Sequence, residues 1–489
     1  MGVLRGGRGH LFLTGRAGTG KTFFLERARE ELSASRNLAV VAPSGVAAIN
    51  ARGKTIHSFF RIKPKAYAPD GPELTHLFAQ NFPLKQEGRD ILRALDLLFI
   101  DEVSTVRADL LDVIDTILRR IRRRPDEVFG GVQLCLIGDA FQLPPVVTNQ
   151  QERALLDDHY PSLFFFSARC FQSAHWTAVE LPVVMRQRDR QFVQLLNRVR
   201  TGTVTTPDLE LLNSRVVGPS SVGPLEDGRV LLTPTRRAVA ERNEAALIGL
   251  RTPSVYFEAA LTGTFKEADM PTERRLRLKV GALVMFLTNA ADQSYYNGRV
   301  GIVQEIGAAS VTVVTEVGQP IEVTRHRWEN VRFTYDRAAK QLHQQTVGTF
   351  TQFPLRLAYA ITIHKSQGLT LDRAFVDLTD TFEDGMAYVA LSRVRHVDGL
   401  LLSAPVTLDS IRVSSAATDF QRWVDGQQQT PSTAAGARVP RFAPPAVAPD
   451  QHTAGDAADS LVERVAQLEQ QYAELRGILT QLGEVLRKL

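Results

Sequence analysis

The stretch GRAGTGKT, from Gly15 to Thr22, constrains the fold of this 489-residue chain more than any other feature. An apolar segment, HLFLTG, leads into it, and an amphipathic segment, KTFFLERAREEL, begins at its last two residues. Glycines between a strand and a helix let the backbone wrap around phosphate groups, which the free amides at the helix N-terminus then bind. The pattern predicts a phosphate-binding loop in a parallel α/β sheet.

The residues of this loop have separate expected roles. The amides from about Gly18 to Thr22 face the phosphates, and the Lys21 ammonium lies beside the β- and γ-phosphates. The Thr22 hydroxyl is a predicted Mg²⁺ ligand. We therefore expect ATP and Mg²⁺ as cofactors. The predicted ATP-binding residues are Gly15, Ala17, Gly18, Thr19, Gly20, Lys21 and Thr22.

Two further apolar segments end in polar residues that suit a nucleotide site. In LLFIDEVS, Asp101 is expected to hold Mg²⁺ and Glu102 to polarise the attacking water. Adjacent acids at a strand end can also form a solvated turn, but the phosphate loop favours the catalytic interpretation. In LIGDAFQLPPV, Gln142 can sense the γ-phosphate or the attacking water. Asp139 either shares that role or caps the following turn, and the sequence leaves both open.

Alternating apolar strands and amphipathic helices predict an α/β fold with two parallel-sheet domains, because the chain is too long for one core. We expect the first over residues 1–180, interrupted by a loose insertion at about 59–92, and the second over 181–275 and 346–425. Short strands with frequent turn residues predict a small β-barrel inserted at 276–345.

The C-terminal part differs in composition from the rest. Residues 426–460 are rich in Ala, Pro and Gln and predict a flexible linker. Residues 461–489 carry apolar side chains at alternating spacings of four and three, which predicts a coiled coil and self-association or a partner helix. The alternative is a helix that docks on the preceding domains. The positions are Leu461, Val465, Leu468, Tyr472, Leu475, Leu479, Leu482, Leu486 and Leu489.

Composition excludes several other classes of protein. Cys135 and Cys170 belong to no CxxC pair, so neither a zinc site nor a disulfide framework is expected. No apolar run approaches membrane-spanning length, and we expect a cytoplasmic protein without a membrane partner. The net charge of +5 leans mildly toward a polyanionic partner.

Six segments in order resemble the motifs of one known family: GRAGTGKT, APSGVAAINARGKTIHSFF, LLFIDEVS, GDAFQLPPV, AITIHKSQGLTLD and YVALSRVRH. They are similar to the motifs of the Pif family (petite integration frequency), in the 5′-to-3′ branch of helicase superfamily one. The resemblance runs from about His10 to Pro405. The segment from Leu181 to Gly202 is similar to the one that separates Pif members from RecD-like helicases.

The resemblance implies two RecA-like domains that close on ATP and move single-stranded DNA. The insertion at 59–92 would be a wedge that splits duplex, and the barrel a Src-homology-three-like module. The expected partners are single-stranded and forked DNA, with G-quadruplexes or RNA–DNA hybrids as further substrates, in repair, recombination or replication. A bacterial, nucleoid-associated enzyme is expected. The alternatives are a RecD-like helicase, or a DNA-stimulated ATPase that remodels protein–DNA complexes with little unwinding.

The resemblance also implies roles for individual residues. Arg186 and Arg393 would be arginine fingers from the second domain, and Gln367 would couple the nucleotide to DNA. Phe59 and Phe60 could stack on bases, although core positions are the alternative. Asn289 and Tyr296 are weaker candidates for backbone contacts. The DNA-binding candidates are Thr55, His57, Ser58, Phe60, Asn289, His364, Lys365 and Ser366.

Family members usually carry, upstream of the phosphate loop, a Gln that reads adenine. Only MGVLRGGRG precedes the first strand here, and it contains no Gln. Either the chain start is truncated or base recognition is relaxed. The second interpretation predicts weaker ATP binding and poor discrimination between ATP and GTP.

Overall fold

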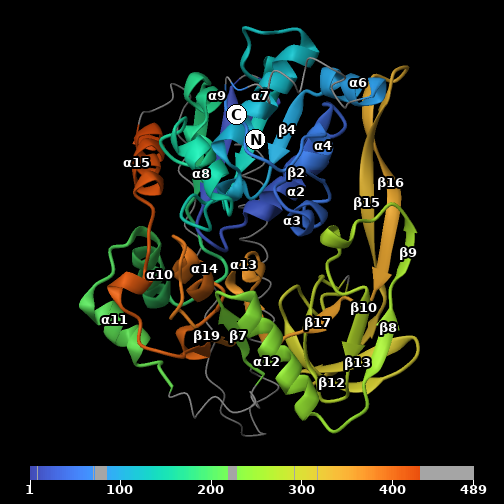
Figure 1. Ribbon diagram of the computed structural model, residues 1–489, viewed down its shortest axis with the longest axis vertical. Helices are drawn as coiled ribbons and strands as arrows, with labels where there is room; N and C mark the ends of the chain where they lie inside the picture. Colours follow the sequence, from blue (N-terminus) through green and yellow to red (C-terminus); the bar gives the residue numbers. More distant parts are fainter. Residues whose placement is uncertain are drawn as a thin grey trace, which may run out of the picture.

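The computed structural model describes residues 1–7, 9–69, 71, 85–217, 228–290, 292–316 and 318–429. The predicted coiled coil and nearly all of the predicted linker lie outside these residues. Figure 1 shows two α/β lobes stacked one above the other, with an arm of β-strands along one side. In the described part of the chain, no helix is long and apolar enough to cross a membrane.

The first lobe contains a six-stranded parallel sheet in the order β3-β2-β4-β5-β1-β6. Side chains alternate between its faces: Phe12 joins one apolar core, whereas Leu11 and Leu13 join the other. Both faces are therefore covered, as parallel sheets require. The strands are β1 His10–Gly15, β2 Leu38–Ala42, β3 Lys54–Thr55, β4 Leu97–Ile100, β5 Gln133–Ile137 and β6 Trp176–Leu181.

Helices flank this sheet and place its loops. Leu25, Ala28 and Leu32 of one helix, α2, pack in the core that contains Leu11 and Leu13. The longest helix of this lobe, α7, packs in the opposite core with eight of its apolar side chains among the buried residues of the lobe. The helices are α1 Gly2–Arg5, α2 Lys21–Leu32, α3 Gly45–Asn50, α4 Ile56–Phe60, α6 Gln86–Ala94, α7 Ala108–Arg122, α8 Gln150–Asp157 and α9 Arg169–Ser173.

The second lobe has a smaller parallel sheet, in the order β18-β7-β19-β20. Its core surrounds the fully buried helix α14. The elements are β7 Val230–Thr233, β18 Ala360–Thr362, β19 Ala374–Val376, β20 Leu400–Leu402, α10 Arg190–Thr201, α11 Thr206–Asn213, α12 Arg236–Gly249, α13 Ile363–Ser366 and α14 Met386–Leu391.

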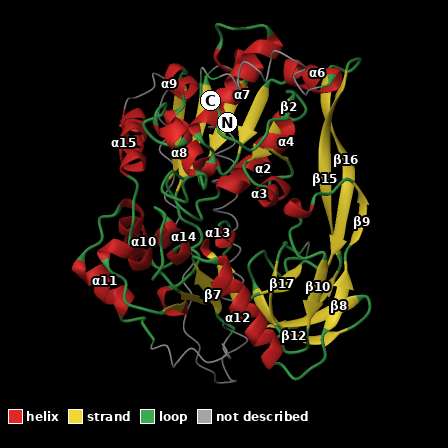
Figure 2. Cartoon of the chain, viewed as in Figure 1, coloured by secondary structure: helices red, strands yellow, loops and turns green. Residues whose placement is uncertain are grey.

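The β region inserted into the second lobe differs from the expected compact module. A five-stranded antiparallel sheet and a two-stranded sheet share one apolar core, and closure into a barrel stays a prediction. Figure 2 shows that two long strands leave this core as a hairpin. The strands are β8 Val255–Glu258, β9 Ala260–Gly263, β10 Arg275–Leu278, β11 Leu283–Phe286, β12 Val300–Ile306, β13 Ser310–Thr315, β14 Pro320–Thr324, β15 His326–Asp336, β16 Gln341–Gln352 and β17 Leu355–Leu357.

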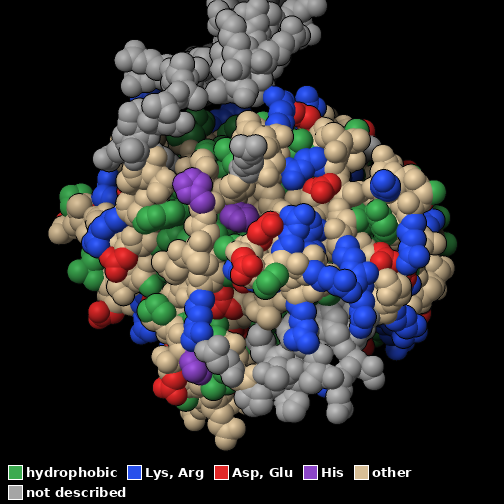
Figure 3. Space-filling view, turned by 90° about the horizontal axis from the view of Figure 1, so that it is seen from above, with side chains coloured by type: hydrophobic (Ala, Val, Ile, Leu, Met, Phe, Trp, Pro, Cys, Tyr) green, Lys and Arg blue, Asp and Glu red, His purple; other side chains and the backbone are tan. Residues whose placement is uncertain are grey.

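The hairpin of β15 and β16, here called the arm, reaches the first lobe. The Asn37 side chain accepts the Leu342 N–H at 2.8 Å and donates to the Lys340 carbonyl at 3.1 Å. Arg332 pairs with Glu87 of α6. Seen from above, Lys and Arg side chains gather on the side of the molecule that carries the arm (Figure 3).

The last described helix, α15 (Ser415–Gln429), follows the second lobe in sequence but packs on the first. The Phe420 ring stacks on Phe166 with centroids 4.2 Å apart, and Val424 is fully buried. The predicted boundary at residue 425 therefore falls inside a helix. The reason is that Phe420 and Trp423 anchor the helix, while the polar residues after them still continue its last turn.

Candidate active site between the two lobes

A pocket of about 640 Å³ lies between the two lobes. The first lobe contributes the phosphate loop and the ends of β4 and β5, and the second contributes the segments after α13 and α14. Residues of the pocket wall include Ala17, Gly18, Thr19, Gly20, Lys21, Thr22, Glu102, Gln142, Met185, Arg186, Gly368, Asp372, Arg393 and Arg395. The structure thus brings most of the predicted nucleotide-site residues into one pocket, and Gln367 contacts its wall through Glu102 and Gln142.

The phosphate loop has the predicted position, between the end of β1 and the start of α2 at Lys21. Gly18 has φ +78°, and a Cβ on it would lie 2.4 Å from the Arg186 Cβ, so this position requires glycine. The Lys21 ammonium donates to the Gly15 carbonyl at 2.6 Å and to the Arg16 carbonyl at 3.0 Å. Burial lowers the pKa of Lys21, so an anion beside this ammonium would be strongly favoured.

The acidic pair lies directly after β4. Burial, and then the charge of Glu102, raises the pKa of Asp101 to about 7. A carboxylate in such surroundings is stabilised by a cation, and the Thr22 hydroxyl offers a second oxygen. Within the described ranges no group of three or more His, Cys, Asp or Glu side chains gathers. Mg²⁺ takes few protein oxygens and completes its shell with phosphates and water, so Asp101 and Thr22 would be enough to hold it.

Gln367 joins the two lobes at the predicted site of water attack. Its Nε2 donates to the Glu102 carboxylate at 2.8 Å and to the Gln142 side-chain oxygen at 3.1 Å. Gln367 follows α13 of the second lobe, whereas its two partners follow β4 and β5 of the first. Movement of one lobe therefore changes the surroundings of both side chains expected to act on water.

Of the two predicted arginine fingers, Arg393 is buried and Arg186 is partly buried, and they lie close to each other. Burial, and then the charge of Arg393, lowers the pKa of Arg186 to about 9. Burial lowers the pKa of Arg393 to about 10. Their guanidiniums donate hydrogen bonds to neutral oxygens, including the Ser392 and Val389 carbonyls at 3.2 and 2.7 Å. None of the ion pairs found among the described residues includes either side chain. Two such guanidiniums favour a polyanion between the lobes.

Arg186 lies nearer to the first lobe than expected. The Met185 N–H donates to the Gly18 carbonyl at 2.9 Å, which holds this segment against the phosphate loop. The Arg186 guanidinium then reaches across to Ser392 in the second lobe. Arg186 therefore belongs to the segment that connects the first lobe to the second, and of the two arginines only Arg393 comes from the second lobe.

Two buried residues of the site were not predicted from the sequence. The Ala17 N–H, in the phosphate loop, donates to the Tyr388 hydroxyl of α14 at 2.9 Å. The Gln187 amide donates to the Ser392 and Val394 carbonyls at 3.0 and 2.9 Å. Gln187 directly follows Arg186 in VMRQ, and Tyr388 shares the segment YVALSR with Arg393, which was the only available signal.

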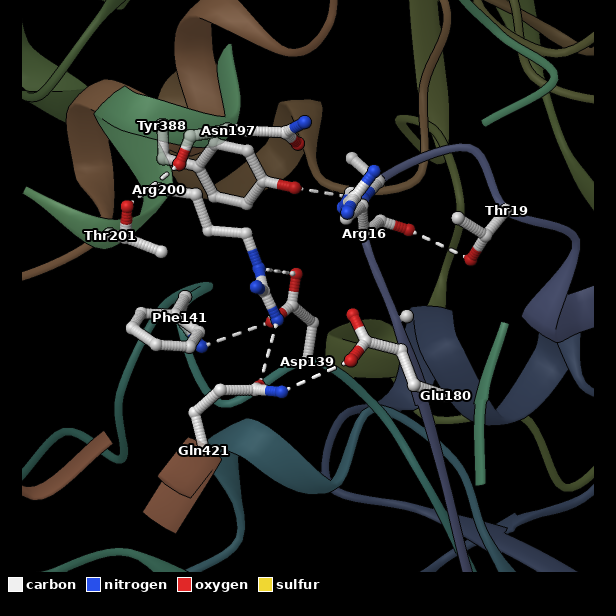
Figure 4. A network of polar contacts seen from close by, with 12 residues as sticks. Arg16, Thr19, Asp139, Phe141, Glu180, Asn197, Arg200, Thr201, Tyr388 and Gln421 are labelled. Carbon is white, nitrogen blue, oxygen red and sulfur yellow. Dashed lines mark hydrogen bonds and ion pairs between the residues drawn. The ribbon is translucent and has the colours of Figure 1, made fainter. Parts of the chain in front are cut away.

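Asp139 fulfils the turn-capping role that the sequence left open. Its carboxylate accepts the Phe141 N–H at 3.2 Å and pairs with Arg200 of α10 at 2.9 Å (Figure 4). The Arg200 guanidinium also lies 4.3 Å from the centre of the Phe141 ring. Figure 4 shows Gln421 of α15 beside this pair. Asp139 thus joins the first lobe to α10 and α15.

Replacing Asp139 with Ala is expected to lower the free energy of unfolding by about 3–5 kcal/mol, because Arg200 would remain as a buried charge without its partner. Urea denaturation followed by circular dichroism measures the change. The double variant Asp139→Ala/Arg200→Met is the control, and it should recover part of the loss. A single variant as stable as the unchanged protein would contradict the assigned role of the pair.

The DNA candidates of the first lobe fall into two groups. The Thr55 hydroxyl caps α4 by accepting the Ser58 N–H at 3.3 Å, and burial followed by the charge of Arg107 lowers the pKa of His57. These three residues lie at the surface or half-buried, as a DNA contact requires. Phe60 is completely buried in the core of the first lobe. The prediction that Phe60 stacks on bases is therefore wrong, and the alternative of a core position is correct. The reason is that the apolar face of α4 packs against the core.

The DNA-binding candidates of the second lobe also differ in their exposure to solvent. The His364 Nε2 lies 3.0 Å from a Glu383 carboxylate oxygen, and Lys365 is exposed. Ser366 is fully buried, and its hydroxyl donates to the Ile363 carbonyl at 2.7 Å, so it does not face DNA. Ser366 was predicted to contact DNA but lies on the buried face of the short helix α13, which explains why this prediction fails.

Asn289 and Tyr296 organise the loop between β11 and β12. The Asn289 side chain accepts the Asn297 N–H at 2.8 Å. The Tyr296 hydroxyl donates to Asp372, a residue of the nucleotide pocket wall. The DNA contacts expected of both residues stay predictions.

A phosphate loop, an acidic pair, and arginines held between two parallel-sheet lobes define a nucleotide-driven motor of the helicase type. The family model of the PIF1-like helicases matches residues 2–210. The ATP-dependent DNA helicase Pif1 of Bdellovibrio bacteriovorus is 32% identical over 414 residues, which cover 82% of this chain and 85% of that protein. The chain belongs to the Pif1 helicase family. It is therefore an ATP-dependent DNA helicase, and the resemblance of the motifs is confirmed.

Solved structures agree with this assignment. The crystal structure of Bacteroides sp Pif1 in complex with ADP-AlF4 is 36% identical and has a TM-score of 0.81, covering 87% of this chain and 95% of that one. The structure of Bacteroides Pif1 bound to ssDNA is 36% identical with a TM-score of 0.60, covering 87% and 96%. The first neighbour supports the use of ATP, with Mg²⁺ as the usual partner metal.

Proposed function

We propose that the protein translocates 5′-to-3′ on single-stranded DNA and unwinds duplex ahead of it. The observation that carries this proposal is the bond of Gln367 to both Glu102 and Gln142. It makes the relative position of the lobes part of the hydrolysis site, as a translocating motor needs. The direction rests on the resemblance of the motifs and of the Leu181–Gly202 segment.

In the proposed cycle, ATP enters between the lobes and neutralises Lys21, Arg186 and Arg393. Closure brings the two guanidiniums onto the γ-phosphate, while Glu102 polarises the attacking water. Hydrolysis removes the anion that holds the cations together, so their mutual repulsion opens the cleft. Each opening and closing moves the strand by about one nucleotide, as the family resemblance implies.

The proposed DNA path runs over Thr55, His57 and Ser58 of the first lobe and His364 and Lys365 of the second. A second pocket, of about 330 Å³, lies between the first lobe and the arm. It supports a path along this side because its wall is basic and includes Ser58. Its basic residues are Lys54, Arg61, Lys85 and Arg332. The region at 59–92 would act as the wedge, and the lobes as RecA-like domains.

Unwinding of tailed duplexes tests the proposed direction. We expect a duplex with a 5′ single-stranded tail to be unwound in the presence of ATP, because the motor loads on the tail and moves toward the junction. A duplex with a 3′ tail should stay intact. A gel or fluorescence assay with both substrates measures the outcome. Unwinding from the 3′ tail alone would contradict the proposal, and a blunt duplex serves as the control.

The same assay separates the alternative functions. ATPase activity that single-stranded DNA stimulates, together with no unwinding of any tailed duplex, would favour remodelling of protein–DNA complexes. A RecD-like helicase shares the polarity, but the Leu181–Gly202 segment argues against it. We place the enzyme at the bacterial nucleoid, in repair, recombination or replication.

We also propose that the heptad positions at 461–489 join copies of this chain. The basis is the strict spacing of the apolar side chains in the sequence. Light scattering should give a mass above that of the 54.2 kDa chain for the full protein and a monomer mass after truncation at Gln429. Truncation there keeps all of α15 and so preserves the fold. A monomer in both cases would contradict self-association.

A further inference from the structure

Phe382 is a large apolar side chain at the surface that no part of the nucleotide site uses. It lies in the loop between β19 and α14 and is 53% exposed. Its ring and the His364 ring are nearly parallel, with an angle of 25° and centroids 6.4 Å apart. His364 is one of the predicted DNA contacts, so an exposed aromatic ring stands beside the proposed strand path.

The loop that carries Phe382 lies at the boundary of the two lobes. A Cβ on Gly385 would lie 2.6 Å from the carbonyl oxygens of Phe141 and Gln142, which follow β5 of the first lobe. The Gly385 N–H donates to the Arg412 carbonyl at 2.9 Å, and the Arg412 guanidinium donates back to the Phe382 carbonyl at 3.4 Å. Phe382 is therefore held at the point where a strand would pass from one lobe to the other.

The polar groups around the ring favour a nucleobase over a phosphate. Glu383 bonds to His364, and Asp384 lies near Arg412, so carboxylates flank the ring. These charges repel phosphates from the ring itself. The cations lie to one side, where Lys365 is close to Arg356 and Arg236. An aromatic face beside a cationic track is how proteins bind single strands without reading sequence.

We propose that Phe382, with His364 beside it, forms a stacking platform for one base of single-stranded DNA at the crossing between the lobes. The proposal rests on the proposed function of the chain as a motor on single-stranded DNA. The phosphates of the bound strand run over the Lys365 side, and the base covers the Phe382 ring. Because stacking accepts every base, the platform adds affinity without sequence preference.

Fluorescence anisotropy with a dye-labelled oligothymidylate tests the platform. Phe382→Ala is expected to weaken binding by about fivefold or more, because base stacking on an aromatic ring is lost. Phe382→Leu should weaken binding similarly, whereas Phe382→Trp should bind within about twofold of the unchanged protein. Leu408→Ala is the matched control, since Leu408 is also exposed (61%) on the second lobe, and it should leave binding unchanged. Thermal unfolding verifies that each variant folds.

An oligomer of abasic deoxyribose phosphates separates stacking from backbone contacts. On this ligand, Phe382→Ala and the unchanged protein should bind equally. The proposal is overturned if Phe382→Ala binds oligothymidylate as tightly as the unchanged protein, if Phe382→Leu retains full affinity, or if the loss persists on the abasic strand. Failure of the unchanged protein to bind any single strand would instead overturn the proposed function.

Discussion

Replacing Lys21 with alanine is expected to abolish ATP hydrolysis, and with it DNA unwinding. The Lys21 ammonium lies partly buried at the phosphate loop, where it would meet the β- and γ-phosphates at low dielectric. Loss of one such preorganised charge lowers kcat by at least about 10²-fold. The rate of phosphate release, measured with and without single-stranded DNA, reports the change.

The stability of the Lys21→Ala variant distinguishes a catalytic loss from a folding defect. Burial lowers the pKa of Lys21, and its ammonium donates hydrogen bonds to the main-chain carbonyls of Gly15 and Arg16. Removing it should therefore leave the melting temperature without nucleotide unchanged or higher. Lys63→Ala, at an exposed lysine outside the pocket, is the control and should keep full activity. Substantial hydrolysis by Lys21→Ala would refute the assignment of the loop.

Removing either arginine finger is expected to lower kcat by about 10³-fold or more while ATP still binds. Arg393 is buried and Arg186 lies partly buried beside it, and no ion pair among the described residues includes either, so their charge is available for a transferring phosphoryl group. Stopped-flow binding of a fluorescent ATP analogue, beside steady-state hydrolysis, separates affinity from rate.

Arg393 needs a second variant, because its side chain is only 1% exposed and its truncation would open a cavity inside the second lobe. Arg393→Lys keeps a charge of similar reach, so it should fold normally yet still lose most activity, since lysine lacks the planar fork. Arg186→Ala removes a side chain from the pocket wall and is the cleaner test. Normal kcat in Arg186→Ala and Arg393→Lys together would exclude their role in hydrolysis.

The nucleotide site was predictable because its functional residues lie in short, contiguous sequence motifs. Lys21 and Thr22 begin the helix that follows one apolar strand, and Asp101 and Glu102 directly follow another. Parallel strands bring such ends to one edge of a sheet. The alternation of strands and helices likewise indicated both lobes. Gln367 and Arg393 were assigned through the resemblance of their motifs; Arg393 lines the pocket, and Gln367 contacts Glu102 and Gln142 of the pocket wall.

Features that depend on packing between distant segments could not be predicted. The alternation of side chains in β15 and β16 is the same whether the strands close a compact sheet or extend as an arm. Phe60 and Phe382 are both phenylalanines in polar surroundings of the sequence, yet one is buried and the other is exposed. The Asp139–Arg200 pair joins residues whose contact only the folded chain reveals.

The position of α15 determines how the lobes can move. The chain enters the second lobe at residues 182–189 and leaves it at 411–414, and both crossings are anchored on the first lobe, through β6 and through Phe420 of α15. A body held at two points of its boundary cannot translate freely. We expect the second lobe to rotate about the line that joins its two connections to the first lobe. We therefore expect ATP to rotate the second lobe about this line more readily than to translate it, and a probe attached at Gln429 would report the position of the first lobe although it follows the second in sequence.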